Sequence, residues 1–534
     1  MEKRALLAVV LSVIVLIGYQ MLFIKPKLDH QKIIESAKST SDHVTTEDNN
    51  SNTQKSETNL TETQKPETKP ETIKTSKIDI STSTSANERS LKVETPLYNA
   101  IFSTKGANIH SFVIKEFKDA NGQHTTLLKK PLYMPPMSMG QTRKLELSTA
   151  VFDTASSDVT LDKDGNGSIV FTFKSNGIDI KRTYKFYGNT YKIDLKDEIK
   201  GMDEYFITLG SSFGYSGNTA SNSHIGPVVL EEFSKRDINP AKDLDTPKYY
   251  KDNIKWAGQE DMYFVAAIVP ITGIKEAIIY KENDESLVTF RSDTKTNEYV
   301  LYAGPKKQEQ LKSLNLSLEN LIDFGFFSII AKPIFWLLEF LNHYLRNYGW
   351  SIIALTIILR VPFIPLINKG QSSMKKLQKL QPLMNEIKEK FKKDPARMQK
   401  EMMELYKKHK VNPMGGCLPI LIQIPVFFAL YKVLLVSIEL RDAPFIFWIV
   451  DLSAKDPYYV LPLVMGATMF IQQKMTPTGM DPKQAKIMLA MPIVFTFMFL
   501  NFSSGLVLYW LCSNLLSITQ QIFVNKRADQ TPAI

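Results

Sequence analysis

Cysteine is scarce in this chain: among 534 residues there are two, Cys417 and Cys512. Both lie in long apolar stretches, so the sequence predicts no disulfide framework for any part of the protein. Acidic residues are also fewer than basic ones: the chain has 55 Asp and Glu and 65 Lys and Arg, which gives a formal net charge of +10. Such an excess suits nucleic acid or acidic membrane surfaces. The densest basic segment lies between two apolar stretches, which favours a membrane protein without a specific nucleic-acid target.

Recognisable catalytic and metal-binding patterns are missing as well. The segment from Gly210 to Gly214 matches G-x-S-x-G, but it lies in a region of β periodicity instead of the α/β sheet that this motif requires. Residues 162–167 begin like a calcium loop, yet Phe173 stands where the twelfth position needs Glu. The seven His residues lack metal-ligand spacing: they are His30, His43, His110, His124, His224, His343 and His409. We therefore expect no enzyme, no metal and no cofactor.

The N-terminal 90 residues divide into an apolar and a polar part. Residues 5–24 contain no charged side chain, and 20 helical residues span ~30 Å of hydrocarbon. Because Lys25 and Pro26 follow directly, without a small-residue cleavage site, residues 1–24 are predicted to be an uncleaved signal anchor. Residues 25–90 contain neither Gly nor an aromatic residue and are predicted to form a disordered linker.

An all-β domain is predicted for residues 91–318. Apolar residues alternate there, as at Ile169, Phe171 and Phe173, and Asn176-Gly177 supplies a turn. Several such runs indicate a β-sandwich. After this domain, residues 326–346 have a polar stripe on one side and apolar residues on the other, with Trp336 near the apolar edge. This pattern predicts an amphipathic helix in the membrane interface, the alternative being a surface helix of the β domain.

Five further apolar segments predict membrane-spanning helices, so that the chain is a polytopic α-helical membrane protein with about six spans. Residues 369–410, between the first two of these segments, contain 13 Lys and Arg and five acidic residues. The positive-inside rule places this loop in the cytoplasm, both termini inside and residues 25–349 mostly outside. A short cytoplasmic tail is expected at 524–534. The predicted spans after the anchor are residues 350–367, 418–440, 458–473, 487–502 and 505–523.

The cytoplasmic loop is itself predicted to be structured. Leu377, Leu380, Met384, Ile387 and Phe391 follow one another at intervals of three and four, and the pattern resumes after Asp394-Pro395. Two helices with this spacing pair as an antiparallel coiled-coil hairpin with their basic residues outside. The residues expected on its basic face are Lys375, Lys376, Lys379, Lys388 and Lys392.

Arg360 is the residue with the strongest functional signal, because it stands in the middle of an apolar span. A charge at that depth costs at least ~2.5–3.5 kcal/mol and is expected to face water or a partner. Thr356 is one helical turn away, and Gln423 adds an amide from the next span. The last span carries a polar stripe, so a hydrophilic groove with one positive charge is predicted. The alternative is that Arg360 reaches the membrane edge while the stripe bonds between helices. The stripe comprises Trp510, Ser513, Asn514, Ser517, Gln520 and Gln521.

Three motifs resemble the signatures of YidC-type bacterial membrane protein insertases. They are Val411-Asn412-Pro413-Met414-Gly415-Gly416-Cys417-Leu418-Pro419, the segment Asp451-Leu452-Ser453 with Asp456-Pro457-Tyr458-Tyr459, and Ser504-Gly505-Leu506-Val507-Leu508-Tyr509. The resemblance covers the whole chain and implies an inner-membrane insertase with a large periplasmic β-sandwich. It implies that Arg360 and Thr356 lie in a client groove. It also implies that Trp510 takes the place of a groove Tyr.

The same resemblance implies partners and a path for the client. The partners would be nascent membrane proteins, the lipid bilayer, the Sec translocon with its accessory subunits and, weakly because the tail is short, the ribosome. A client would leave along the third and fifth spans, whose Met-rich surface adapts to many sequences. The residues expected on this hydrophobic slide are Ile424, Phe427, Met491, Val494 and Met498.

Two other functions fit parts of the sequence. A secondary transporter would use Arg360 as a small-anion site, but it should show repeated halves and broken helices. A membrane-tethered periplasmic carbohydrate-binding protein would make the β domain the functional part, and no carboxylate pair for processing sugars is identifiable.

Overall fold

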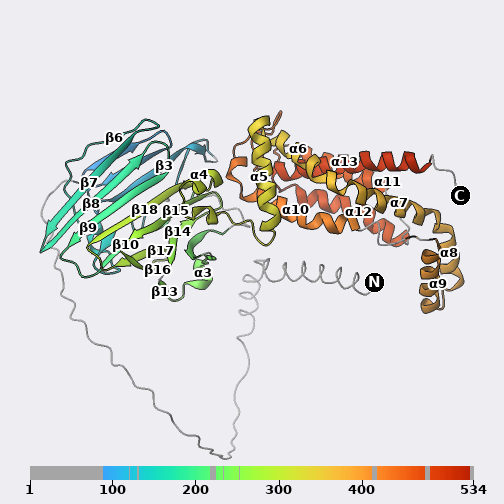
Figure 1. Ribbon diagram of the computed structural model, residues 1–534, viewed down its shortest axis with the longest axis horizontal. Helices are drawn as coiled ribbons and strands as arrows, with labels where there is room; N and C mark the ends of the chain where they lie inside the picture. Colours follow the sequence, from blue (N-terminus) through green and yellow to red (C-terminus); the bar gives the residue numbers. More distant parts are fainter. Residues whose placement is uncertain are drawn as a thin grey trace, which may run out of the picture. The chain divides into compact units, whose positions relative to one another are not determined.

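The computed structural model describes residues 88–529, apart from 120, 129–130, 217–223, 233, 252, 410, 412–417 and 476–481. The predicted anchor at 1–24, nearly all of the linker and one end of the tail lie outside the described residues. The described residues form one compact unit, in which strands come first and helices follow (Figure 1).

The β domain consists of three sheets. The largest has eight strands in the order β12-β11-β14-β15-β18-β9-β8-β7, and its paired strands are antiparallel. At one edge of this sheet β7 and β8 form a long hairpin, and Asn176 and Gly177 in its turn both have positive φ (51° and 81°). The strands are β7 (Asn166–Ser175), β8 (Ile178–Tyr187), β9 (Lys192–Lys200), β11 (Gly226–Glu231), β12 (Ser234–Asp237), β14 (Ile254–Glu260), β15 (Phe264–Thr272) and β18 (Thr296–Pro305).

Two five-stranded sheets complete the domain. Their orders are β4-β3-β2-β1-β6 and β13-β16-β17-β10-β5, and only the β1–β6 pair is parallel among these described strands. Two short helices, α3 (Pro240–Asp243) and η1 (Glu146–Thr149), lie in the connections. The strands are β1 (Ser90–Glu94), β2 (Tyr98–Ser103), β3 (Asn108–Lys118), β4 (His124–Thr126), β5 (Met139–Gly140), β6 (Val159–Thr160), β10 (Tyr205–Thr208), β13 (Lys248–Lys251), β16 (Ile274–Glu282) and β17 (Glu285–Ser292).

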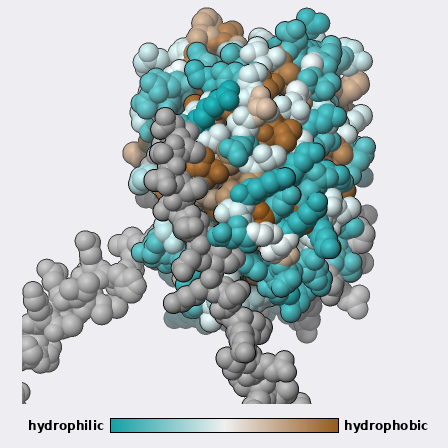
Figure 2. Space-filling view, turned by 90° about the vertical axis from the view of Figure 1, so that its left-hand side faces the viewer, coloured by the Kyte–Doolittle hydropathy of each residue, from teal (hydrophilic) through white to brown (hydrophobic). Residues whose placement is uncertain are grey.

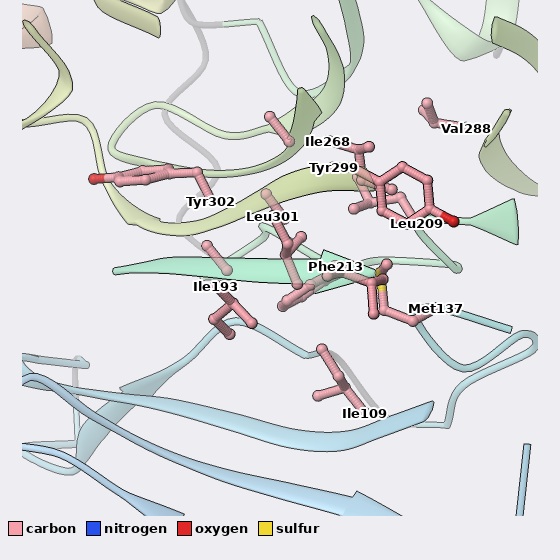
Figure 3. Close-up of a cluster of buried hydrophobic side chains, with 14 of the residues drawn as sticks. Ile109, Met137, Ile193, Leu209, Phe213, Ile268, Val288, Tyr299, Leu301 and Tyr302 are labelled. Atoms are coloured by element: carbon pink, nitrogen blue, oxygen red, sulfur yellow. The ribbon is translucent and has the colours of Figure 1, made fainter. Parts of the chain in front are cut away.

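The core of the β domain lies between these sheets. Ile109 of β3, Ile193 of β9 and Leu301 of β18 are completely buried and point into one cluster (Figure 3). Alternation explains the arrangement, since β8 buries every second residue and exposes or half-exposes the others. The outer surface is different. The face in Figure 2 is mainly hydrophilic, with hydrophobic residues in small separate groups, as expected for a surface in contact with water.

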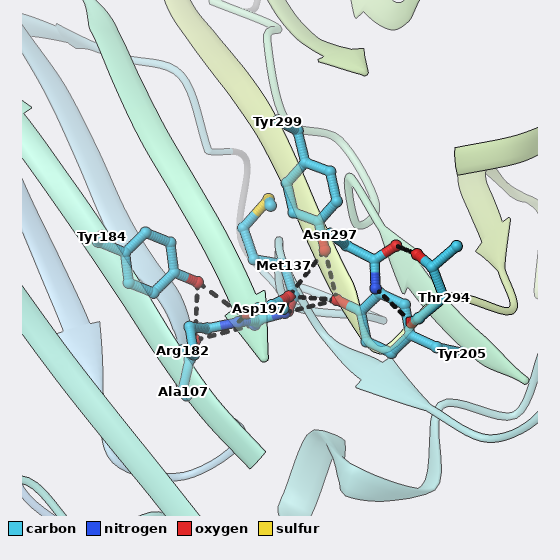
Figure 4. A network of polar contacts seen from close by, with 9 residues as sticks. All are labelled: Ala107, Met137, Arg182, Tyr184, Asp197, Tyr205, Thr294, Asn297 and Tyr299. Atoms are coloured by element: carbon cyan, nitrogen blue, oxygen red, sulfur yellow. Dashed lines mark hydrogen bonds and ion pairs between the residues drawn. The ribbon is translucent and has the colours of Figure 1, made fainter. Parts of the chain in front are cut away.

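One charged pair is enclosed in this core. Arg182 and Asp197 have no exposed side-chain surface, and Nη2 of Arg182 lies 2.7 Å from Oδ2 of Asp197 (Figure 4). Tyr299 donates to the same carboxylate at 2.8 Å, and Tyr205 is also hydrogen-bonded to it. Nη1 of Arg182 donates to the Met137 carbonyl at 2.6 Å. Both charges are thus fully hydrogen-bonded, which is the condition for burying an ion pair without a large net cost.

The helical part begins with α4 (Gln308–Ser313), η2 (Leu318–Leu321) and α5 (Ser328–Leu345). Ala331, Ile334 and Leu338 of α5 are buried in a cluster with residues of α10, while Trp336 and Tyr344 are 64% and 69% exposed. The helix therefore has one packed face and one exposed aromatic face, and its location in the membrane interface stays a prediction.

Among the described residues, eight α-helices and two short 3₁₀ helices follow, and their bounds differ from those of the predicted spans. The segment 350–367 is not one helix, because α6 ends at Arg360, where Pro362 interrupts the backbone hydrogen bonding and a 3₁₀ turn follows. The last helix continues to Asp529, so residues 524–529 of the predicted tail are helical. The elements are α6 (Tyr348–Arg360), η3 (Val361–Phe363), α7 (Ile364–Lys379), α8 (Gln381–Lys390), α9 (Pro395–Lys408), α10 (Leu418–Val436), η5 (Ile438–Leu440), α11 (Val460–Met475), α12 (Pro482–Phe499) and α13 (Ser504–Asp529).

Two helical stretches among the described residues are long and apolar enough to cross a membrane: Tyr348–Lys379 and Ser504–Lys526. The apolar parts of α10 and α12, Gln423–Val436 and Leu489–Phe499, are shorter.

The segment predicted as a coiled-coil hairpin contains three helices. The first arm is divided, because α7 ends at Lys379 and α8 begins at Gln381, with Pro382 in its first turn. Leu377, Leu380 and Met384 form a small buried cluster, against which Met402 and Leu405 of α9 pack. Ile387 and Phe391, expected at the seam, are only half-buried.

Candidate functional site

Arg360 lies at the C-terminal end of α6, and its side chain reaches α13. Nη1 donates to the carbonyl of Ser513 at 2.9 Å and to its Oγ at 3.1 Å, and Nη2 donates to Oγ of Ser517 at 2.6 Å. Ser513 and Ser517 are one helical turn apart and so present their hydroxyls on the same face. Nε is buried and has no hydrogen-bond partner among the described residues.

No carboxylate of the described residues lies within ion-pair distance of Arg360. Hydroxyl and carbonyl oxygens hold the guanidinium in place but leave its positive charge uncompensated. Because Arg360 is half-buried among protein groups, this charge attracts an anionic partner more strongly than a charge in bulk water would.

The side chain of Arg360 lines an open cavity between α6, α7, α10 and α13, which we call the Arg360 pocket. Thr356 lines it, although its hydroxyl already donates to the Ile352 carbonyl at 2.6 Å. Gln423 contributes an amide that donates to Ser513 Oγ at 3.1 Å. The pocket is therefore polar on the side of Arg360 and apolar elsewhere. The apolar lining residues are Leu359, Phe363, Leu366, Ile367 and Val426.

The residue of α13 that adds an aromatic ring to the pocket is Tyr509, and Trp510 is not among the lining residues. Tyr509 lines the cavity beside Arg360 and Gln423. Trp510 instead packs edge-on against Phe427, with ring centroids 4.8 Å apart, and against Phe499 at 5.0 Å. Trp510, expected in the groove, therefore lies in an apolar cluster between α10, α12 and α13. Tyr509 lines the pocket, and the sequence pattern did not identify it as a site residue.

The polar residues of the α13 stripe contact two different sets of neighbouring helices. Ser513, Ser517 and Gln520 face α6 and α7, and the Gln520 amide donates to Oδ1 of Asn368 at 2.7 Å. Asn514 donates to Thr468 of α11 at 3.3 Å, and Gln521 donates to the Met475 carbonyl at 2.7 Å. Asn514 and Gln521 therefore hold α13 against α11 and do not line the pocket.

Comparison with known proteins now decides the family. Residues 90–337 match the family model described as the YidC periplasmic domain, and residues 340–531 match that of the 60Kd inner membrane protein. The membrane protein insertase YidC of Geotalea daltonii is 41% identical over 98% of this chain and 99% of its own length. That of Syntrophus aciditrophicus is 40% identical over 99% and 100%.

The chain belongs to the YidC family of membrane protein insertases. Among solved structures it is similar to an active YidC insertase with its first transmembrane domain resolved, with 19% identity, coverage of 81% of this chain and 92% of that one, and a TM-score of 0.38. As a member of this family, the chain is an inner-membrane protein with a periplasmic β-sandwich domain. Its substrates are nascent membrane proteins.

The residues expected on the hydrophobic slide of this YidC-family protein lie on two helices. Met491, Val494 and Met498 of α12 are 42%, 61% and 46% exposed and form one apolar surface. Ile424 and Phe427 of α10 are half-buried. Phe427 contacts Trp510, so the aromatic cluster connects the slide residues of α10 with α12.

The basic face expected around α7 to α9 is mostly exposed. Lys376, Lys379 and Lys392 are exposed and Lys388 is half-buried. Lys375 differs, because its ammonium donates to the Asn525 carbonyl at 3.0 Å and connects α7 with α13.

Two residue groups of the β domain resemble chemical sites but have structural roles. Ser212, the serine of the G-x-S-x-G segment, is buried, and its Oγ donates to Oε2 of Glu285 at 2.9 Å. His224, Asp237 and Glu260 place possible metal-ligand atoms within 4.8 Å of one another. Lys235 already lies 2.6 Å from Glu260 and 3.2 Å from Asp237, so a lysine ammonium occupies the position where a cation would be attracted.

Proposed function

We propose that this insertase receives the polar end of a client in the Arg360 pocket and releases the client's apolar segment along α10 and α12. The observation that supports this mechanism is the bonding of Arg360, which contacts the oxygens of Ser513 and Ser517 and no described carboxylate. A translocated tail with an acidic residue would replace part of its lost hydration by attraction to this charge. Burial of the client's apolar segment in lipid, ~25 cal/mol per Å², supplies the driving force.

The proposed topology follows from the charges of the loops. Residues 1–24 and the segments around α6, α10, α11, α12 and α13 would form six spans, with both termini in the cytoplasm and residues 25–349 mostly in the periplasm. The basic segment 369–410 would then be a cytoplasmic receiver for nascent chains. The Sec translocon with its accessory subunits and, more weakly, the ribosome are the proposed partners on this route.

Site-specific photocrosslinking tests the path. We expect a stalled nascent membrane protein to crosslink to probes at Gln423 in the pocket and at Val494 on α12. A probe at Leu463, which is 58% exposed on α11, is the control and should capture lipid instead of client. Equal client capture at all three positions would show that the client does not follow the proposed path.

A substitution in α8 tests whether the basic segment acts as a structured receiver. Met384 is 3% exposed, so Met384→Asp buries a charge between α8 and α9 and should unpair them, with a loss of insertion of roughly tenfold or more. Leu383, its neighbour on the same helix, is 40% exposed, and Leu383→Asp should change insertion by less than about twofold. The measurement is in vitro insertion with membrane levels of each variant matched. If both variants lose the same activity, added negative charge is the cause, and the segment acts as an electrostatic docking patch.

A further inference from the structure

The extracytoplasmic end of α10 is embedded in the β domain. Ile438, two residues beyond the end of the helix, has no exposed surface and belongs to the same apolar core as the residues of the β-sheets. Arg441 follows after η5, and its Nη2 donates to the carbonyl of Lys118 at the end of β3 at 2.6 Å.

Three aromatic rings of the β domain surround the guanidinium of Arg441. Its central carbon lies 6.0 Å from the ring centroid of Phe117, 5.6 Å from that of Tyr263 and 5.3 Å from that of Phe264. The rings are almost completely buried, and the Arg441 side chain is only 10% exposed. Cation–π attraction grows when the cation is desolvated, so these contacts are at the strong end of their range.

The ion pair of Arg441 is weak by comparison. Its Nε lies 4.0 Å from Oδ2 of Asp442, whose side chain is 53% exposed, and pairs of this kind contribute little. The main contacts of Arg441 are therefore with the rings of Phe117, Tyr263 and Phe264, which we call the aromatic box. Tyr263 also contacts Ser453, farther along the same loop.

We propose that Arg441 is a positioning residue. It binds the β domain to the extracytoplasmic end of α10, and this contact fixes the position of α10 at the Arg360 pocket. Only four residues separate Arg441 from Val436, the last residue of α10. Gln423 of the pocket and Phe427 of the apolar slide are on that helix, so a change in its placement alters both. The effect on insertion rests on the proposed function, but the docking itself does not.

A crosslinking experiment tests the docking without any client. In a full-length Cys417→Ser, Cys512→Ser protein, Lys118→Cys and Asp442→Cys introduce exposed thiols on the two sides of the contact, and a short bis-maleimide reports their proximity in membrane vesicles. We expect rapid intramolecular crosslinking, slowed roughly tenfold by Arg441→Ala and much less by Arg441→Lys, which keeps the cation but not the planar guanidinium.

Lys455→Ala is the matched control, because Lys455 is an exposed cation of the same loop that lies 5.9 Å from the ring of Tyr459 and not at the aromatic box. It should leave the crosslinking rate unchanged. Phe117→Leu removes one ring from the opposite side and should slow crosslinking as well, which provides a second test if Arg441→Ala is not recovered in membranes. Absence of the crosslinked product in the parent protein, or equal rates with and without Arg441, would overturn the proposal.

Insertion assays then separate this role from that of the pocket. Arg441→Ala should reduce insertion of acidic and neutral clients by the same factor, and Arg441→Lys should restore most of it. A loss that depends on client charge would contradict a positioning role. If crosslinking responds as expected but insertion of every client is unaffected, the β domain docks on α10 without positioning it, and the proposal fails in that part.

Discussion

Replacement of Arg360 by Ala is expected to reduce insertion of a client with one Asp in its translocated tail roughly tenfold, the change that ~1.4 kcal/mol of lost attraction produces. The matched client, with Asn in place of that Asp, should lose less than about twofold. The difference follows from the structure, because Arg360 has no described carboxylate partner and its charge is available to the client. The measurement is insertion into proteoliposomes from the same translation reaction.

Other variants at this position give a ranking. Arg360→Lys should retain most activity with both clients, because Ser513 and Ser517 offer single oxygens and no bidentate carboxylate. Arg360→Glu should fail most clearly with the acidic client, since like charges repel in a pocket of this kind, which is half-buried in protein. Ser517→Ala removes one hydrogen bond to the guanidinium and keeps its charge, so it serves as the control and should be mild. Equal losses for both clients in Arg360→Ala would leave Arg360 with a structural role only.

Replacement of Arg182 by Ala should destabilise the β domain by about 3–5 kcal/mol, because Asp197 would remain as a buried charge without its partner. For a domain of this size such a loss lowers the thermal midpoint by roughly 10 °C or more. The isolated domain, residues 88–323, can be followed by the fluorescence of Trp256, whose indole N–H donates to the Ser317 carbonyl at 3.0 Å.

Two comparisons make this expectation specific. Lys196 on the neighbouring strand β9 forms a half-exposed pair with Glu298 at 3.0 Å, and Lys196→Ala should leave the midpoint almost unchanged. Arg182→Met combined with Asp197→Leu should recover part of the lost stability, because it removes both charges. The recovery should be incomplete, since the Met137 carbonyl loses the Arg182 donor and the hydroxyls of Tyr205 and Tyr299 keep only each other. A single Arg182→Ala variant as stable as the parent would mean that the pair is not buried in solution.

The period of the apolar residues was sufficient to predict the type of most elements. Alternation in residues 166–200 corresponds to β7, β8 and β9, because one face of each strand must be buried in the sandwich core. The bounds of the helices were less predictable. Apolar residues stand on both sides of Arg360, so hydropathy does not reveal where α6 ends. The 3₁₀ turn that follows arises because Pro362 has no amide hydrogen.

The site was only partly predictable from the sequence, because its make-up depends on contacts between segments that are far apart in the chain. Tyr509 and Trp510 have similar helical spacing to Ser513 and Ser517, so sequence alone gave no reason to prefer Tyr509 as the aromatic residue of the pocket. What distinguishes them is the packing of Phe427, Phe495 and Phe499 around Trp510. The division of the α13 stripe between α7 and α11 likewise depends on which helices lie beside it.

The break after Arg360 has an electrostatic consequence. The aligned peptide dipoles of α6 leave a partial negative charge at its C-terminal end, and Pro362 has no N–H with which to satisfy the carbonyl of Ile358. A cation in the last turn of a helix gains ~0.3–1 kcal/mol from such an end, and up to ~2 kcal/mol where it is partly buried. The end of α6 therefore acts as a diffuse counter-charge, which stabilises the guanidinium in place without neutralising it as a carboxylate would.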